Sequence, residues 1–124
     1  MGSAQEATVR ALLDSYATLD WDAVAAHYAD NATLSVVAWY EPLVGRDAIR
    51  KDLDRQGGVY TDFRHKIVNV ASTDSVVFAE RVDTVRMGGR DITIHAMGVF
   101  EVQDGKITAW RDYFDMKEIE AQLA

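Results

Sequence analysis

The chain has 124 residues, 48% hydrophobic and 27% charged, which is the composition of one globular domain with a single core. Its formal net charge of −7 argues against binding to nucleic acid or to an anionic membrane, because both rely on Lys and Arg to neutralise phosphates. It has no cysteine, which excludes a disulfide framework, a thiolate nucleophile and a cysteine-based metal site.

The N-terminal segment has the pattern of an amphipathic helix. Polar residues Glu6, Arg10 and Asp14 recur at helical spacing, so the segment is not expected to be a signal peptide. No apolar run approaches the roughly 20 residues that cross a bilayer. With the absence of cysteine, these features favour a cytoplasmic location. The apolar face of this first helix is predicted to hold Val9, Leu12, Leu13, Tyr16 and Leu19.

Shorter elements follow in the next 40 residues. Asp20 is suited to cap a second helix that runs to Tyr28. The segment "ATLSVVAWY" (32–40) is typical of a strand. "EPLVGR" then turns into a third helix, which we expect from about Asp47 to Gly57-Gly58.

The second half of the chain is mainly β. Strands are predicted at 63–72, 75–87, 90–102 and 106–115, and "MKEIEAQLA" predicts a last helix. Helices followed by a run of strands indicate one α+β domain over residues 1–124. In it, the N-terminal helices pack on one curved, mostly antiparallel sheet.

Two turns predict how the last three strands pair. Gly88-Gly89 suits a two-residue hairpin turn, which pairs Met87 with Arg90. "VQDGK" (102–106) suits a three-residue loop, which pairs Val102 with Lys106. From these registers we expect three cross-strand pairs: Arg81 with Ala96, Ala96 with Asp112, and Asp83 with Ile94.

The predicted pairs place Arg81, Ala96 and Asp112 in one row across three strands, with Asp83 on the same face. The Cα atoms of Arg81 and Asp112 are then about 10 Å apart, and a residue as small as Ala96 lets the guanidinium pass. Asp83, Arg81 and Asp112 can therefore form one charge chain on an apolar face. The apolar residues expected around it are Val77, Ala79, Ile92, Ile94, Phe100, Trp110 and Phe114.

A buried Asp–Arg–Asp chain has a structural interpretation and a catalytic one. An ion pair could simply hold the sheet together, but buried ion pairs rarely stabilise a fold better than apolar packing does. Two carboxylates against one guanidinium also leave a net negative charge, so one carboxyl is expected to hold a proton. That leaves one acid and one base on either side of an Arg, which suits a reaction that moves protons at two points.

Two segments that carry these residues, "ERVDTV" and "GVFEVQDGKITAWRDYFD", resemble the limonene-1,2-epoxide hydrolase family. This family lies within the SnoaL-like, NTF2-like superfamily. "VGRDAI" (44–49) and its distance to the first segment also fit, and the resemblance covers roughly residues 5–120. It implies a cone-shaped NTF2-like fold and a homodimer.

The resemblance also implies a mechanism. Asp112 matches the general base that takes a proton from water, Asp83 matches the acid that protonates the epoxide oxygen, and Arg81 matches the bridging Arg. Neither a cofactor nor a metal is implied. His27, His65 and His95 are spaced unlike any metal motif, which also argues against a metal site.

The water site departs from the family pattern. Ser35 and Val37 stand where the family has a Tyr and an Asn, and Tyr40 or Tyr60 could replace them. The substrate is expected to be a hydrophobic small-molecule epoxide other than limonene oxide, bulkier or more polar. The residues expected to bind it or the water are Ser35, Val37, Tyr60, Ile94, Ala96, Trp110 and Phe114.

Two other functions stay open. A SnoaL-like cyclase or a ketosteroid-isomerase-like enzyme could use Asp112 to remove a proton next to a carbonyl, which needs no positioned water. A non-catalytic protein that binds a hydrophobic ligand could keep the charge chain as structure.

The other face of the predicted sheet is unusually apolar. Glu80 and Arg111 flank it, but most of its residues are apolar, and a whole sheet face of this kind is rarely left exposed to water. A homodimer that packs sheet to sheet is therefore expected; the alternative is coverage by terminal segments of the same chain. The apolar residues of this outer face are Phe78, Val82, Met97, Val99, Ala109 and Tyr113.

Overall fold

The computed structural model describes residues 3–37 and 41–124. In chain order the elements are α1 (Ser3–Ser15), a 3-10 turn η1 (Tyr16–Thr18), α2 (Trp21–Ala25), β1 (Tyr28–Val36), β2 (Leu43–Val44), α3 (Arg46–Val59), β3 (Tyr60–Ser72), β4 (Val76–Met87), β5 (Arg90–Gln103), β6 (Lys106–Phe114) and α4 (Met116–Leu123).

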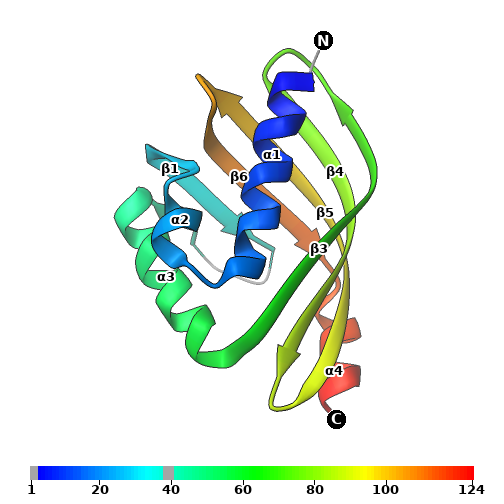
Figure 1. Cartoon of the computed structure of the whole chain (residues 1–124). Coiled ribbons are helices and arrows are strands. Elements are labelled where there is room, and N and C mark those ends of the chain that lie inside the picture. Colours follow the sequence, from blue (N-terminus) through cyan, green and yellow to red (C-terminus); the bar gives the residue numbers. More distant parts are fainter. Residues whose placement is uncertain (1–2, 38–40) are drawn as a thin grey trace.

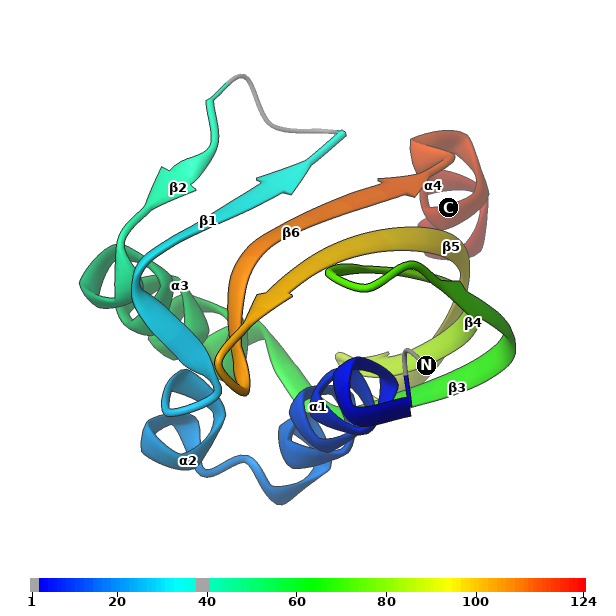
Figure 2. The same cartoon turned by 90° about the horizontal axis from the view of Figure 1, so that it is seen from above.

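The strands form one six-stranded sheet in the order β2-β1-β6-β5-β4-β3. All neighbours are antiparallel except β1 and β6, which run parallel. The sheet curls strongly, α1 lies on its concave side, and α2 and α3 lie beside β1 (Figures 1 and 2). The predicted α+β architecture, with helices over one curved and mostly antiparallel sheet, is confirmed.

The structure confirms the first helix and most of the residues predicted for its apolar face. Val9, Leu12 and Leu13 are at most 1% exposed, and Tyr16 follows them into the core. Leu19 is an exception to the prediction. It caps the C-terminal end of η1 in a left-handed conformation, with a φ of 59°, and the residue is 42% exposed.

The region between α1 and β1 differs from the prediction. Asp20 does cap α2, since its side chain accepts a hydrogen bond from the backbone N–H of Ala23 at 3.2 Å. However, the helix ends at Ala25, and Tyr28 already belongs to β1. Tyr28 is fully buried, and its hydroxyl lies 2.9 Å from that of Tyr16. Tyr28 is therefore a core residue of β1 and not, as predicted, the last residue of the second helix.

The third helix ends at Val59, one residue beyond the predicted end at Gly57-Gly58. Gly57 lies against the indole of Trp21: a Cβ at this position would stand 2.5 Å from Trp21 Nε1. The lack of a side chain at Gly57 therefore allows α2 and α3 to pack closely together.

The first hairpin is confirmed. Gly88 and Gly89 both have positive φ, at 59° and 78°, as a two-residue turn of this kind requires. The expected partners follow from it: Met87 with Arg90, Asp83 with Ile94, and Arg81 with Ala96.

The second hairpin is shorter than predicted. Asp104 and Gly105 form a two-residue turn with φ of 52° and 74°, so Gln103 pairs with Lys106 and the predicted pairing of Val102 with Lys106 is wrong. An irregularity between Glu101 and Val102 then shifts the register once more.

These two shifts correct one predicted pair at the site. Asp112 lies opposite Gly98, and Ala96 lies opposite Phe114. The shortened turn and the irregularity each move the pairing by one residue. Because their sum is two residues, Asp112 stays on the face that was predicted for it.

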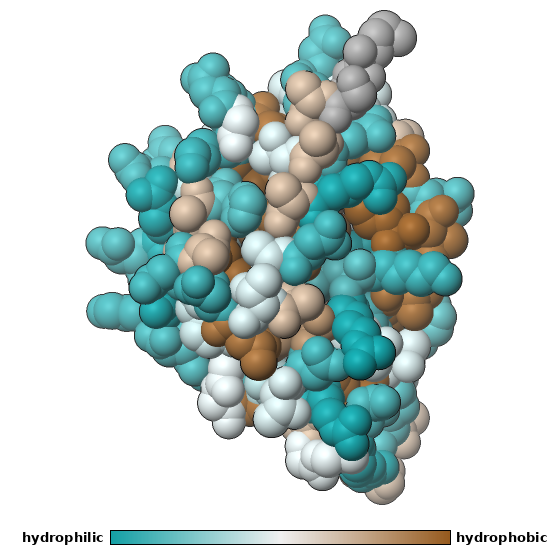
Figure 3. All heavy atoms as spheres, viewed as in Figure 1, coloured by the Kyte–Doolittle hydropathy of each residue, from teal (hydrophilic) through white to brown (hydrophobic). Residues whose placement is uncertain are grey.

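The outer face of the sheet leaves large apolar side chains in contact with solvent. Phe78, Met97 and Tyr113 are 40%, 41% and 48% exposed. Figure 3 shows that the surface on the helix side is mainly hydrophilic, with scattered hydrophobic residues and a larger group of them at the right edge of the view. No helix among the described residues is long and apolar enough to cross a membrane.

The last helix, α4, is held to β5 by polar contacts. Asp115 caps it as predicted, accepting from the backbone N–H of Lys117 at 2.9 Å. His95 is exposed, and its Nδ1 lies 2.7 Å from a carboxylate oxygen of Glu118 on α4. His95 therefore points away from the concave side of the sheet.

Candidate active site

Arg81 on β4 links two carboxyl groups on the concave face. Its Nε and Nη2 donate to Asp83 at 3.1 and 2.8 Å. Its Nη1 and Nη2 donate to the two oxygens of Asp112, each at 2.8 Å. The side chain of Arg81 is 0% exposed, and those of Asp83 and Asp112 are only 7% and 12% exposed. The sequence prediction that these three residues meet is confirmed.

Gly98 makes room for this arrangement. It lies on β5 between Arg81 and Asp112, and a Cβ on it would stand 2.5 Å from Nη1 of Arg81. The guanidinium carbon lies 6.0 Å from the ring centre of Phe100 and 5.5 Å from that of Trp110. Both distances fall within the range in which a cation is attracted to an aromatic face.

Asp112 accepts a further hydrogen bond that the sequence reasoning did not foresee. The indole Nε1 of Trp110 donates to Oδ1 of Asp112 at 3.0 Å. Among the described residues, Oδ1 thus accepts two hydrogen bonds, whereas Oδ2 accepts one, from Arg81. A carboxylate oxygen has two lone pairs, so Oδ2 can accept one more hydrogen bond.

The charge of Arg81 is secure in this setting. Burial acts to lower its pKa, but the hydrogen bonds to Asp112 and Asp83 outweigh burial, so its pKa lies above the ordinary value. The guanidinium therefore remains a fixed cation between two carboxyl groups.

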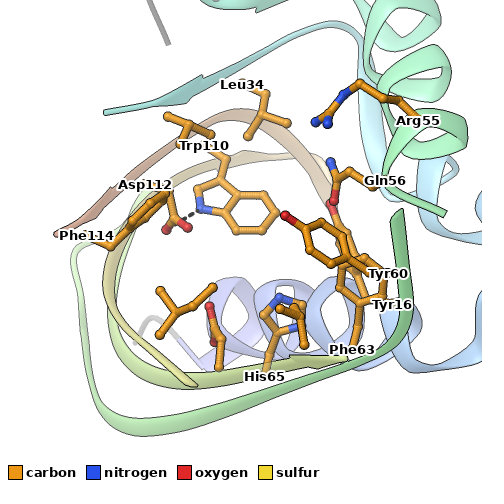
Figure 4. A pocket seen from close by; sticks show the side chains of 14 residues that line it. Tyr16, Leu34, Arg55, Gln56, Tyr60, Phe63, His65, Trp110, Asp112 and Phe114 are labelled. Carbon is orange, nitrogen blue, oxygen red and sulfur yellow. Dashed lines mark hydrogen bonds between the residues drawn. The ribbon is translucent and has the colours of Figure 1, made fainter. Parts of the chain in front are cut away.

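Asp83 and Asp112 both border a cavity of about 180 Å³ (Figure 4). This volume is small beside the roughly 300–1,000 Å³ of most ligand pockets, so the cavity suits a small molecule. Four of the predicted binding residues line it, namely Tyr60, Ile94, Trp110 and Phe114. The other lining residues are Tyr16, Leu34, Val36, Arg55, Gln56, Phe63, His65 and Val85.

The structure places three of the predicted binding residues outside this lining. Ala96 is buried next to the site, Ser35 is half-buried, and Val37 is 54% exposed. Tyr40, the other candidate for the water site, lies outside the described residues.

Leu34 and Val36 take the positions on β1 that face the cavity. They pair with Trp110 and Asp112 through the parallel contact between β1 and β6. A strand in such a contact has no hairpin turn to set its register, and side chains alternate along it. An error of one residue in the expected register of β1 therefore places Ser35 at the cavity, where the structure has Leu34 and Val36.

His65 on β3 is a lining residue that the sequence reasoning missed. It follows Phe63 by two residues and so shares the buried face of that strand, a signal that was available. Its ring stacks on Phe63 at 6.4 Å and meets the edge of Tyr16 at 5.1 Å. Its Nδ1 is buried and has no hydrogen-bond partner among the described residues.

The pKa of His65 lies below the ordinary value. Burial is the main cause; the negative charge of Asp83 acts in the opposite direction but is outweighed. The imidazole is therefore mostly neutral near neutral pH. In Figure 4 it lies across the cavity from Trp110 and Asp112.

The α3 side of the cavity is more polar. Arg55 and Gln56 reach toward it from α3 (Figure 4). Both donate hydrogen bonds to the carboxylate of Asp52, Arg55 Nε at 2.8 Å and Gln56 Nε2 at 2.7 Å.

Among the described residues, no group of three or more His, Cys, Asp or Glu side chains is arranged to hold a metal ion.

Residues 3–124 match the family described as "Limonene-1,2-epoxide hydrolase catalytic domain". The chain is 33% identical over 111 residues to the protein named "Epoxide hydrolase EphG" from Mycobacterium tuberculosis (strain ATCC 25618 / H37Rv), covering 90% of this chain and 73% of that protein.

Solved structures resemble the fold closely. An LEH-like epoxide hydrolase from M. tuberculosis superimposes with a TM-score of 0.81 at 32% identity, covering 94% of this chain and 89% of the other. A protein named as a SnoaL-like polyketide cyclase, from Shewanella denitrificans OS-217, reaches a TM-score of 0.88 at only 15% identity, covering 98% and 97%. The second likeness concerns the fold alone, and it confirms the predicted SnoaL-like, NTF2-like architecture.

Proposed function

Because the chain belongs to the limonene-1,2-epoxide hydrolase family, and is thus an enzyme of the epoxide hydrolase class, we propose that it opens a small epoxide to a diol in one step. Water attacks a carbon of the ring, Asp112 is the base, Asp83 is the acid, and Arg81 orients both. The observation that supports this proposal best is the buried Asp83–Arg81–Asp112 arrangement at the wall of the cavity.

The assignment of base and acid follows from hydrogen bonding and charge. Two buried carboxylates beside one guanidinium would leave one uncompensated negative charge, and a proton on one of them removes it. Asp112 accepts three hydrogen bonds, as suits a carboxylate, which can only accept. Asp83 accepts hydrogen bonds from Arg81 alone among the described residues, so we assign the proton to Asp83.

The proposed reaction is balanced in protons. The oxygen of water forms a bond to one carbon of the epoxide, and one proton of that water passes to Oδ2 of Asp112. The carbon–oxygen bond of the ring breaks, and its oxygen takes the proton of Asp83. Arg81 remains charged throughout, because guanidinium is not deprotonated in proteins. General acid and base catalysis of this kind contributes roughly 10²–10⁴-fold for each group.

The cavity favours a small and largely hydrophobic substrate. Leu34, Ile94 and Phe114 are among the apolar residues of its wall, and polar groups of α3 lie at one side. We infer that the reacting end of the substrate lies between Asp83 and Asp112, and that any further polar group lies toward Arg55 and Gln56.

A second function has one specific observation in its favour. Leu34 and Val36 are the β1 residues that face Asp112, and neither can hydrogen-bond a water molecule through its side chain. A cyclase or isomerase that uses Asp112 to remove a proton beside a carbonyl needs no such water.

The decisive experiment measures diol formation from cyclic and terpene epoxides in water enriched in heavy oxygen. Wild type should give a labelled diol, and Asp112→Asn and Asp83→Asn should each lose roughly 10²–10⁴-fold in kcat. Asp91→Asn, an exposed carboxylate on β5, should keep full activity. If no epoxide yields a diol while a carbonyl substrate exchanges protons through Asp112, the second function replaces the first.

We also propose that two copies pack through their outer sheet faces, where Phe78, Met97 and Tyr113 are exposed. The cytoplasmic location stays a prediction.

A further inference from the structure

The reaction proposed above leaves the two carboxyls in exchanged protonation states. After each turnover Asp112 carries the proton taken from water, and Asp83 has lost its own. Arg81 bridges them but cannot pass the proton on, because guanidinium does not give one up in proteins. Before the next turnover Asp112 must lose a proton and Asp83 must gain one.

His65 is placed to serve Asp83. The two residues are direct partners in the register of β3 and β4, and both line the cavity. Side chains paired in this way have Cβ atoms about 4.5–5.5 Å apart. No direct hydrogen bond joins them, so transfer would need one bridging water or a small rotation of the ring. Among the fourteen residues that line the cavity, His65 is the only histidine.

The buried Nδ1 of His65 is unusual in a folded protein. Buried polar atoms almost always have a hydrogen-bond partner, and exceptions often have a chemical role. Here the ring is fixed by Phe63 and Tyr16, and Nδ1 is left without a partner among the described residues. A purely structural aromatic residue at this position would avoid such an unpaired nitrogen.

We propose that His65 returns a proton to Asp83 between turnovers. Asp112 releases its proton to water in the open cavity, and the neutral imidazole takes a proton from that water. The N–H bond of the imidazolium then breaks as an O–H bond forms on Asp83. No oxidant or further reactant is required. This role rests on the proposed epoxide hydrolysis.

The groups around His65 fit this role. Asp83 and Arg81 face it from β4, Asp112 from β6, Tyr16 from η1 and the backbone of Leu13 from α1. Burial lowers the pKa of His65 despite the carboxyl groups. A lower pKa makes the imidazolium a stronger acid, which favours proton transfer to a carboxylate.

The test separates the first turnover from later ones. His65→Gln keeps a polar side chain of similar length but cannot carry a proton, so the first turnover should proceed at about the wild-type rate. Steady-state kcat should fall about tenfold or more, with a burst of one diol per active site. In His65→Ala, added imidazole should restore part of the steady-state rate. His95→Gln, at an exposed histidine, is the matched control and should behave as wild type.

Three outcomes would overturn the proposal. An unchanged kcat in His65→Gln would show that no relay is needed. An equal loss in the first and later turnovers, without a burst or imidazole rescue, would assign His65 to structure or to the chemical step. Absence of diol from the wild type would overturn the epoxide hydrolysis itself and this role with it. Circular dichroism of both variants shows whether they fold.

Discussion

Nη1 of Arg81 lies 2.5 Å from the point where a Cβ on Gly98 would stand. The guanidinium reaches Asp112, two strands away, across a residue that has no side chain. The charge chain of the site thus depends on a glycine in the middle of a strand, where glycine otherwise weakens a sheet.

The first prediction is that Gly98→Ala damages the site. The new methyl group would overlap both Arg81 and the ring of Phe100, at 2.5 and 2.7 Å. Such overpacking typically costs about 1–3 kcal/mol. We expect kcat/KM to fall at least tenfold, because a rise of about 1.4 kcal/mol in the activation free energy lowers the rate tenfold. Diol formation measures the loss of activity, and urea unfolding measures the loss of stability.

Gly58→Ala is the matched control. Gly58 lies in α3 with nothing within 4 Å of its Cβ position. Replacing glycine by alanine within a helix should stabilise the fold by about 0.5–1 kcal/mol without changing activity. Wild-type activity in Gly98→Ala would contradict the role that we assign to the gap.

The second prediction concerns the cation. Arg81→Met leaves Asp83 and Asp112 buried without their ion-pair partner. Removing one partner of a buried pair typically destabilises a protein by about 3–5 kcal/mol, and urea unfolding measures this. Combining it with Asp83→Asn and Asp112→Asn should recover part of the loss, because no buried charge is then left unpaired.

Arg86→Met on the same strand is its control. Arg86 is half-exposed and lies 3.5 Å from Asp91, a surface pair of the kind that contributes about 0–1 kcal/mol. If Arg81→Met and Arg86→Met destabilise equally, the buried charge chain does not have the energetic weight that its geometry indicates.

The charge chain was predictable because local turn chemistry sets strand pairing. Gly88-Gly89 allows positive φ at both turn positions, which fixes Arg81 opposite Ala96. The irregularity between Glu101 and Val102 was not predicted, because it changes the pairing inside a strand, where no turn motif marks the register. Only the coincidence of two one-residue shifts kept Asp112 on the predicted face.

The rest of the cavity depends on long-range packing. The register of β1 comes from its parallel contact with β6, and no short motif encodes it, so Leu34 and Val36 were missed. Gly57 has the sequence signature of a helix end but instead accommodates Trp21. By contrast, His65 was missed although the alternation from Phe63 would have been enough to place it on the buried face.

The third prediction is a dependence of stability on pH. Burial lowers the pKa of His65 in the folded state, whereas in the unfolded chain it takes the ordinary value of 6.5. The unfolded state therefore binds more protons below about pH 6.5, and the free energy of unfolding should fall as pH is lowered toward the folded pKa. Burial also lowers the pKa of His27, so part of this fall should remain in any His65 variant.

Urea unfolding at several pH values between about 7.5 and 5.5 measures this dependence, within the range over which an ordinary histidine titrates. His65→Gln should show a shallower fall than wild type over that window. Identical slopes in the two proteins would mean that His65 is not held neutral by burial in the folded state.

The fourth prediction concerns assembly. Met97 and Tyr113 are neighbours in the register of β5 and β6 and are both exposed on the outer face. A carboxylate buried there would lose its hydration, so Tyr113→Glu should break the proposed sheet-to-sheet dimer. Light scattering after gel filtration should give twice the chain mass for wild type and the chain mass for the variant. Val44→Glu, at an exposed hydrophobic residue on β2, should stay dimeric. A wild-type protein that is monomeric at every concentration tested would rule out this interface, and the exposed apolar face would then need another partner.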